Sequence, residues 1–254
     1  MLRSRIVPCL LLHDGGLVKT KAFKEGKYVG DALNAVKIFN EKEVDELILL
    51  DIDATSEQRQ PDFARLKTIA VESRMPLCYG GGITSAAQAV EVISLGFEKV
   101  SISAAALARP ALIGEMASAI GSQSVVVTLD VRRNALFPGY SVYTHNGRKK
   151  QKTDLIAFCR QAVDLGAGEI VINSIDRDGA MNGYDLDLAR QVRAAVTCPI
   201  SFVGGAGNRD HMQALIDAVG VVGAVAGSLF VFQGPYRAVL INYDRPPGVR
   251  PAGA

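Results

Sequence analysis

Short runs of β-branched or leucine-rich residues alternate with longer amphipathic stretches along the whole chain, and turn residues separate them. Capping residues at Asp31, Ser85, Asp154 and Asn208, and a proline at Pro110, mark the starts of several predicted helices. Because parallel strands need crossover helices, eight such units predict an α/β fold, a (βα)8 TIM barrel; a doubly wound sheet is the alternative. The strands are expected near residues 5–11, 46–52, 76–80, 98–102, 124–130, 168–174, 199–203 and 221–226, and the helices near 31–43, 60–73, 85–95, 109–119, 153–165, 186–196 and 208–219, with a final helix after Gly234.

The chain resembles itself at an offset of about 125 residues. The run Gly80-Gly81-Gly82-Ile83 matches Gly204-Gly205-Ala206-Gly207, for example. We therefore expect one domain, residues 1–254, built from half-barrels at about 1–120 and 121–245, with a tail at 246–254. Two long connections, residues 12–30 and 131–152, stand in equivalent places. We expect both to be functional or mobile loops on the C-terminal face of the barrel.

Composition narrows the class of protein. Apolar residues make up 48% of 254, enough for a sizeable core, and Lys+Arg 28 nearly cancels Asp+Glu 26, which argues against nucleic-acid or anionic-membrane binding. No apolar stretch reaches the length of a membrane span and no cleavable signal opens the chain, so we expect a cytoplasmic protein. No metal or cofactor is expected, because the four cysteines lack metal-binding spacing. They are Cys9, Cys78, Cys159 and Cys198.

Glycine runs directly follow two predicted strands and precede helices. Such runs expose backbone N–H groups near the positive end of a helix dipole, an arrangement that suits phosphate. A single run could be only a tight turn that needs positive φ, but two in register favour a ligand with a phosphate at each end. The candidate phosphate ligands are Gly80, Gly81, Gly82, Ser103 and Ala104 in the first half, and Gly204, Gly205, Gly207, Gly227 and Ser228 in the second.

Several motifs together resemble HisF, the cyclase subunit of imidazole glycerol phosphate synthase, over nearly the whole chain. They include Arg5-Ile6-Val7-Pro8-Cys9-Leu10, Leu50-Asp51-Ile52, Gly80-Gly81-Gly82-Ile83 and Ser174-Ile175-Asp176-Arg177-Asp178-Gly179. The resemblance implies a barrel that takes ammonia from a HisH-like glutaminase. It uses that ammonia on a doubly phosphorylated aminoketose derivative, without metal or cofactor. It also implies substrate contacts at Lys19, Asp51, Asn173, Asp178 and Gly179.

In that family, two aspartates at the ends of strands 1 and 5 act as general base and acid. Asp130 matches the second, but Leu11 occupies the position of the first, and the internal repeat pairs the same two positions. A leucine cannot transfer a proton, and one acid–base group is worth roughly 100- to 10,000-fold in rate. The resemblance therefore implies that ordinary cyclisation is crippled. Asp14 could substitute only if its loop folded inward, and Asp14-Gly15-Gly16 is typical of a turn.

Charged residues are expected at the opposite end of the barrel. In HisF, a ring of four charged residues at the N-terminal face gates ammonia entry, and Arg5, Glu46, Lys99 and Glu169 match all four positions. Such a ring could be a purely structural ion-pair network. However, buried networks are costly to desolvate and seldom improve on an apolar plug, so the sequence favours a retained gate.

The altered strand 1 resembles a branch of HisF relatives associated with sugar amidation in surface polysaccharide synthesis. A barrel of that branch, with its glutaminase, is thought to supply ammonia to a sugar amidotransferase. Lys19 then belongs to a basic flap, residues 19–28, over the substrate. The remaining alternatives are a genuine cyclase, a noncatalytic ammonia conduit whose chemistry is done by another protein, and a HisA-type sugar-phosphate isomerase. The isomerase also needs two acids and has no need for the charged ring.

Overall fold

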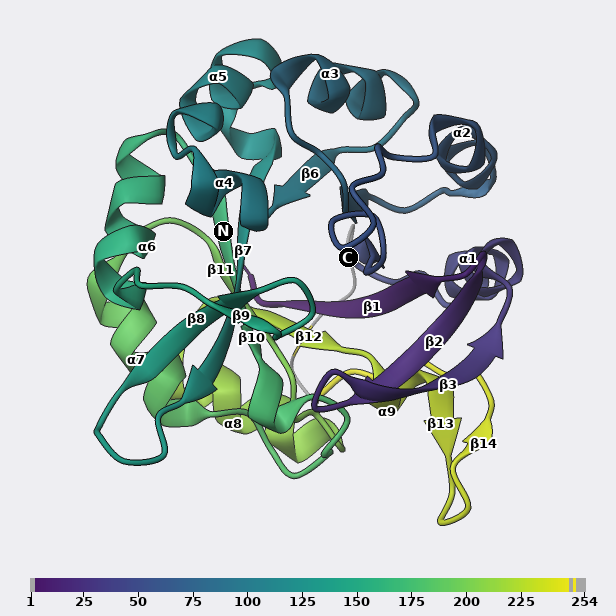
Figure 1. Cartoon of the computed structure of the whole chain (residues 1–254). Coiled ribbons are helices and arrows are strands. Elements are labelled where there is room, and N and C mark those ends of the chain that lie inside the picture. Colours follow the sequence, from purple (N-terminus) through teal and green to yellow (C-terminus); the bar gives the residue numbers. More distant parts are fainter. Residues whose placement is uncertain (1–2, 247–248, 250–254) are drawn as a thin grey trace.

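The protein is described here by a computed structural model that covers residues 3–246 and residue 249. In these residues, eight parallel strands close into a barrel, because β1 pairs with both β4 and β12 while β7 pairs with β10 (Figure 1). The predicted (βα)8 fold is therefore confirmed. The barrel strands are β1 (Arg5–His13), β4 (Leu47–Asp51), β5 (Leu77–Gly80), β6 (Lys99–Ile102), β7 (Val125–Arg133), β10 (Glu169–Ser174), β11 (Ile200–Val203) and β12 (Gly223–Ala226).

Amphipathic helices surround the barrel and bury their apolar faces against it. The four predicted side-chain caps are confirmed, since Asp31, Ser85, Asp154 and Asn208 each accept a backbone N–H from the first turn. Pro110 stands one position before the helix that it was expected to open. The outer helices are α1 (Ala32–Glu41), α2 (Phe63–Glu72), α3 (Ala86–Ser94), α5 (Ala111–Ile120), α6 (Leu155–Asp164), α7 (Leu186–Ala195) and α8 (Arg209–Val219); short helical segments lie at α4 (Ala104–Ala108), α9 (Ser228–Val231), η1 (Ser122–Ser124) and η2 (Ile175–Arg177).

The expected final helix after Gly234 is wrong for the described residues. A small hairpin, β13 (Phe232–Gln233) and β14 (Ala238–Val239), turns at Gly234 with a φ of 72°, and Pro235 follows with no N–H to donate. The chain then runs extended to the N-terminal side of the barrel, where Tyr243 donates its hydroxyl to the Ile6 carbonyl at 2.8 Å.

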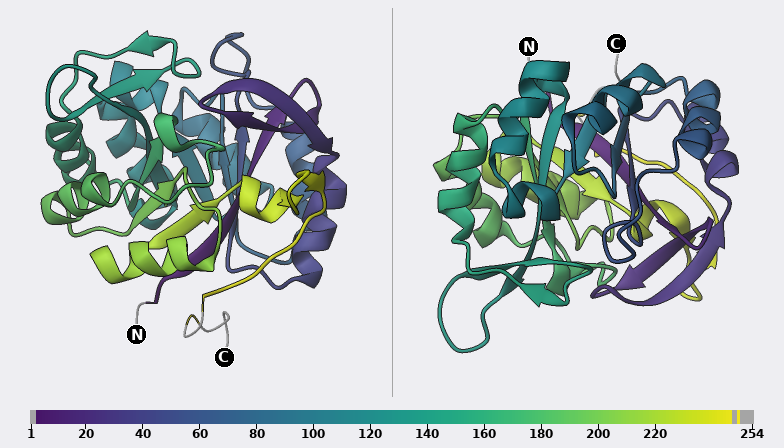
Figure 2. Two further views of the ribbon diagram at one scale, coloured as in Figure 1. Left: turned by 90° about the horizontal axis from the view of Figure 1, so that it is seen from below. Right: turned by 45° about the horizontal axis from the view of Figure 1, so that its top comes forward.

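The two long connections are antiparallel hairpins rather than loops, which corrects the sequence-based expectation. The first consists of β2 (Gly16–Lys21) and β3 (Lys24–Gly30), and the second of β8 (Tyr140–Thr144) and β9 (Lys149–Lys150). They extend the C-terminal ends of β1 and β7, so both lie on the predicted face (Figure 2). Apolar side chains anchor both hairpins, because Val18 of β2 and Val142 of β8 are buried.

Two apolar clusters follow from the period-two alternation of the strands. The larger one fills the space between barrel and helices. The smaller one fills the barrel interior, called the lumen below, and consists of Val7, Cys9, Ile48, Cys78, Val126, Val171 and Val225. No helix in the described residues is long and apolar enough to cross a membrane. The half-barrel boundary near residue 120 stays a prediction, although it falls between α5 and β7.

Candidate active site at the C-terminal end of the barrel

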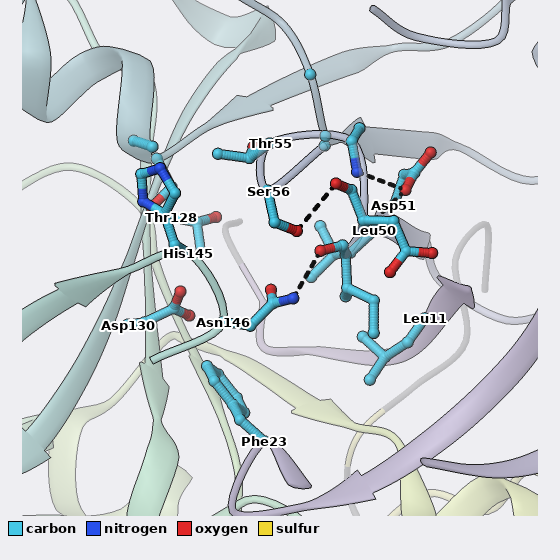
Figure 3. A pocket seen from close by; sticks show the side chains of 18 of the residues that line it. Leu11, Phe23, Leu50, Asp51, Thr55, Ser56, Thr128, Asp130, His145 and Asn146 are labelled. Carbon is cyan, nitrogen blue, oxygen red and sulfur yellow. Dashed lines mark hydrogen bonds between the residues drawn. The ribbon is translucent and has the colours of Figure 1, made fainter. Parts of the chain in front are cut away.

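A cavity of about 1280 Å³ lies at the C-terminal ends of the strands, where (βα)8 barrels carry their chemistry (Figure 3). A second cavity, of about 40 Å³, adjoins it, because Leu11, Leu50 and Asn173 line both. Gly80, Gly81, Gly82, Ser103 and Ala104 line the large cavity, whereas Gly204, Gly205, Gly227 and Ser228 line the small one. The cavities that the two glycine runs line are therefore neighbours.

The first cradle needs glycines for steric reasons. A Cβ at Gly81, whose φ is 134°, would lie 2.6 Å from the Asp51 carbonyl oxygen, and one at Gly82 would lie 2.4 Å from that of Arg59. This close packing is enough to explain why glycine stands at both positions, so the glycines by themselves do not show that a ligand binds here. The Ser103 hydroxyl is buried beside them without a hydrogen-bond partner, and a phosphate oxygen would satisfy it.

The second cradle lies beside a buried lysine. Lys19 donates from Nζ to the Cys9 carbonyl oxygen and approaches Gly227, where a Cβ would lie 2.6 Å from Nζ. Burial lowers the pKa of Lys19, and no carboxylate lies within ion-pair distance of it among the described residues. An anion in this cradle would therefore be strongly favoured. Gly207 lies outside both cavity linings and donates its N–H to His211 Nδ1 at 3.1 Å.

Asp130 lines the large cavity from β7 and is only partly exposed. Burial raises its pKa to about 7, while a hydrogen bond from Asn173 Nδ2, at 3.0 Å, lowers it. A carboxyl with that pKa exchanges protons readily at neutral pH. Leu11 lines the same cavity from β1, so the apolar side chain stands where the sequence predicts a missing carboxylate.

Asp14 does not replace the missing acid. It occupies the β1–β2 turn with a φ of 44°, its side chain is 82% exposed, and it does not line either cavity. The predicted turn is therefore present, and the alternative in which the loop brings Asp14 inward is wrong.

Asp178 and Gly179 hold the first hairpin over the cavity. Asp178 Oδ2 accepts the Thr20 hydroxyl at 2.6 Å and the Phe23 N–H at 3.1 Å, while burial raises its pKa. A Cβ at Gly179 would lie 2.2 Å from the Thr20 carbonyl oxygen. Asp51 is also engaged, because its Oδ1 accepts the N–H groups of Asp53 and Ala54 at 3.0 Å. The substrate contacts predicted for Asp51, Asp178 and Gly179 stay predictions.

Sequence reasoning missed two contacts at the rim of the large cavity. His13, to which the sequence assigns no chemistry, places Nδ1 2.8 Å from Asp53, and this hydrogen bond raises its pKa. Asn146, at the tip of the second hairpin, donates to the Ile52 carbonyl at 2.8 Å and so joins the two halves (Figure 3). Both contacts join segments that are far apart in the sequence, so no local sequence pattern could have predicted them.

The four predicted ring residues meet at the N-terminal end of the lumen. Arg5 bonds Glu46 and Glu169, and Lys99 lies 2.9 Å from both carboxylates. Burial raises the pKa of Glu169, but Arg5 and Lys99 outweigh it and bring that pKa to about 2, so this carboxylate stays ionised. Two cations and two anions therefore close the lumen with balanced charge. The structure fits either a gate or a structural network.

Taken together, these features define a (βα)8-barrel protein with a cavity at its C-terminal face, an apolar lumen beneath it and a ring of ion pairs at the other end. Residues 5–236 match the model of the family described as histidine biosynthesis protein. The chain belongs to this family, and its relatives there are HisF-type subunits of imidazole glycerol phosphate synthase.

Three relatives illustrate the match. A Vibrio vulnificus protein, provisionally named imidazole glycerol phosphate synthase subunit hisF3, is 54% identical over 97% of this chain and 95% of its own length. A Pseudomonas aeruginosa protein, provisionally named as the hisF2 subunit, is 48% identical over 96% of each chain. The Streptococcus mutans imidazole glycerol phosphate synthase subunit HisF is 40% identical over 91% of each chain.

Proposed function

We propose that this chain is the ammonia-accepting subunit of a glutamine-dependent complex and acts on a phosphorylated substrate other than the usual HisF substrate. The observation that carries the proposal is the contrast between the two ends of the barrel. The ionic ring of Arg5, Glu46, Lys99 and Glu169 is complete, whereas Leu11 replaces one of the two acids at the cavity. In this proposal the ring serves as the ammonia intake, and the absence of the second acid weakens cyclase chemistry.

In this proposal, a HisH-like glutaminase binds the N-terminal face and releases ammonia beneath the ring. The lumen above the ring is lined by small apolar side chains, which favour neutral ammonia over ammonium because burial of an unpaired charge is costly. The nitrogen then reaches the cavity between the two cradles, where a substrate held by its phosphates is fixed over the lumen.

We further propose that the product serves sugar amidation in surface polysaccharide synthesis, with a sugar amidotransferase as an additional partner. Support comes from the altered end of β1 and from the identities of 54% and 48% with provisionally named paralogues, against 40% with the Streptococcus mutans HisF. A cytoplasmic location follows from this role.

A specific observation favours a second function, that of a genuine cyclase. Asp130 retains its position and has a pKa of about 7, so one proton-transfer group remains available.

Asp130→Asn distinguishes a subunit that takes part in the chemistry from one that only conducts ammonia. Loss of product formation with intact glutaminase binding supports direct chemistry, and unchanged product formation supports a noncatalytic conduit.

The test of the proposed function is coupling between glutamine hydrolysis and product formation in the reconstituted complex. Lys99→Glu reverses a charge in the ring, and Lys67→Glu makes the same change at an exposed position on α2. We expect Lys99→Glu to uncouple glutamine use from product formation while Lys67→Glu leaves coupling intact. Equal coupling in both variants, with both folded, would contradict the gate. Failure of any glutaminase to bind the chain would contradict the proposed function as a whole.

A further inference from the structure

In the described part of the chain, two polar side-chain atoms are buried without a hydrogen-bond partner, namely Ser103 Oγ and Asn173 Oδ1. Both residues line the large cavity. A hydroxyl can donate to an anion, so Ser103 suits the phosphate cradle in which it lies. The amide oxygen of Asn173 can only accept a hydrogen bond. A fully ionised phosphate has no hydrogen to donate and cannot satisfy it, so its partner must carry an N–H or O–H group.

The hydrogen bond to Asp130 fixes the orientation of the Asn173 amide. Asn173 is opposite Asp130 in the β10–β7 register, and its Nδ2 donates to Asp130 Oδ1 at 3.0 Å. Turning the amide over would place its oxygen against Asp130, and an ionised carboxylate has no hydrogen to donate, so this orientation is the favoured one when Asp130 is ionised. Oδ1 therefore faces away from Asp130, in a residue that is only 8% exposed and that borders both cavities.

The sequence of β10 places this acceptor above the lumen. Alternate residues of a strand share one face, so Glu169, Val171 and Asn173 follow one another along the inside of the barrel. Glu169 belongs to the ionic ring, and Val171 belongs to the apolar lumen. Leu11, Leu50 and Val203 pack against the upper end of the lumen. A small N–H donor that leaves this apolar passage meets Asn173 Oδ1 beside them.

We propose that Asn173 receives ammonia at the top of the lumen, with Oδ1 accepting one N–H while Nδ2 holds Asp130 beside the same nitrogen. Ammonia has three N–H groups and one lone pair, so it can donate to Oδ1 and to the ionised Asp130 carboxylate while its lone pair faces the cavity. Asn173 is then a binding residue for the nucleophile and a positioning residue for Asp130. This inference rests on the proposed function, because that function brings ammonia through the barrel.

The experiment uses the full chain with ¹³C-labelled aspartate and asparagine carboxyl and amide carbons, titrated with ammonium chloride at alkaline pH and with potassium chloride at matched ionic strength. We expect saturable shifts at Asn173 and Asp130 that follow free ammonia. Asn173→Leu, of similar size, should weaken the ammonia response of Asp130 about five- to tenfold, as expected for one lost hydrogen bond. Ser103→Ala, which removes the other unpartnered atom, should leave the response unchanged.

Asn173→Thr provides a milder variant if the leucine disturbs folding. Its hydroxyl can donate to Asp130, so the pKa of Asp130 should rise less than in Asn173→Leu, a difference that a purely structural side chain would not produce. Shifts that follow ribose 5-phosphate but not ammonia would overturn the proposal in favour of a substrate hydroxyl. The absence of any ammonia response would also overturn it. Ammonia binding at Asn173 without glutaminase coupling would retain this inference while the proposed function fails.

Discussion

Replacing Leu11 by aspartate tests the central role assigned to the missing acid. The change places a carboxyl on β1 in the cavity that Asp130 lines from β7. One general acid–base group contributes roughly 100- to 10,000-fold in rate, so cyclase turnover should rise by about two orders of magnitude or more. Loss of a partly buried leucine and burial of a new carboxyl should destabilise the fold by about 1–3 kcal/mol, which an intact barrel tolerates.

The new carboxylate also acts on Asp130. A second negative charge in the same cavity disfavours ionisation of the first, so the pKa of Asp130 should rise above its value of about 7. The two carboxyls then titrate as a pair, and the rate should show a bell-shaped pH profile that the unmodified chain lacks.

The assay follows conversion of the doubly phosphorylated aminoketose used by HisF, with ammonium chloride as nitrogen source and no glutaminase. Leu50→Asp is the matched control, because Leu50 is another leucine that lines the same cavity from β4. We expect a gain for Leu11→Asp and none for Leu50→Asp. The reasoning is refuted if folded Leu11→Asp shows no gain, or if the unmodified chain already turns over as fast as a cyclase with both acids.

Three further predictions follow from charges and backbone geometry. The pKa of Asp130 is raised to about 7 in the folded chain, so ionisation of Asp130 destabilises the fold. The free energy of unfolding should therefore fall by about 2 kcal/mol from pH 5.5 to 8. Urea titrations at the two pH values measure this fall, which should be smaller in Asp130→Asn. Lys99→Met leaves two carboxylates, Glu46 and Glu169, with Arg5 as their one cation in the ring. Because an uncompensated buried charge is costly, the free energy of unfolding should drop by roughly 3 kcal/mol. A drop of less than about 1 kcal/mol would instead show that the ring is well hydrated. Gly81→Ala should destabilise the fold and abolish binding of a phosphorylated ligand, because its Cβ would collide with the Asp51 carbonyl oxygen. Gly15→Ala is the control, since Gly15 also has a positive φ but has open space around it; this variant should show only backbone strain and retain binding. Calorimetry measures the binding of both variants.

The sequence by itself determined the architecture of the barrel. Strand and helix periodicity, with caps such as Asp31 and Asn208, fixed the eight units because these signals are local. The resemblance to HisF implied the charged ring, and the structure brings Arg5 together with Glu46 and Glu169. The repeat and the family resemblance identified Leu11 as the altered position before any coordinates.

Only the tertiary structure decided how the site is closed and how its groups are tuned. Contacts with distant segments hold the two hairpins that replace the expected loops, since Asp178 binds the first and Asn146 of the second binds the Ile52 carbonyl. The extended segment that follows the last hairpin reaches the Ile6 carbonyl. The raised pKa of Asp130 comes from burial, and the unpartnered oxygen of Asn173 from a register between β7 and β10. Burial and pairing between segments far apart in the chain are properties of the folded whole, so no local pattern in the sequence could state them.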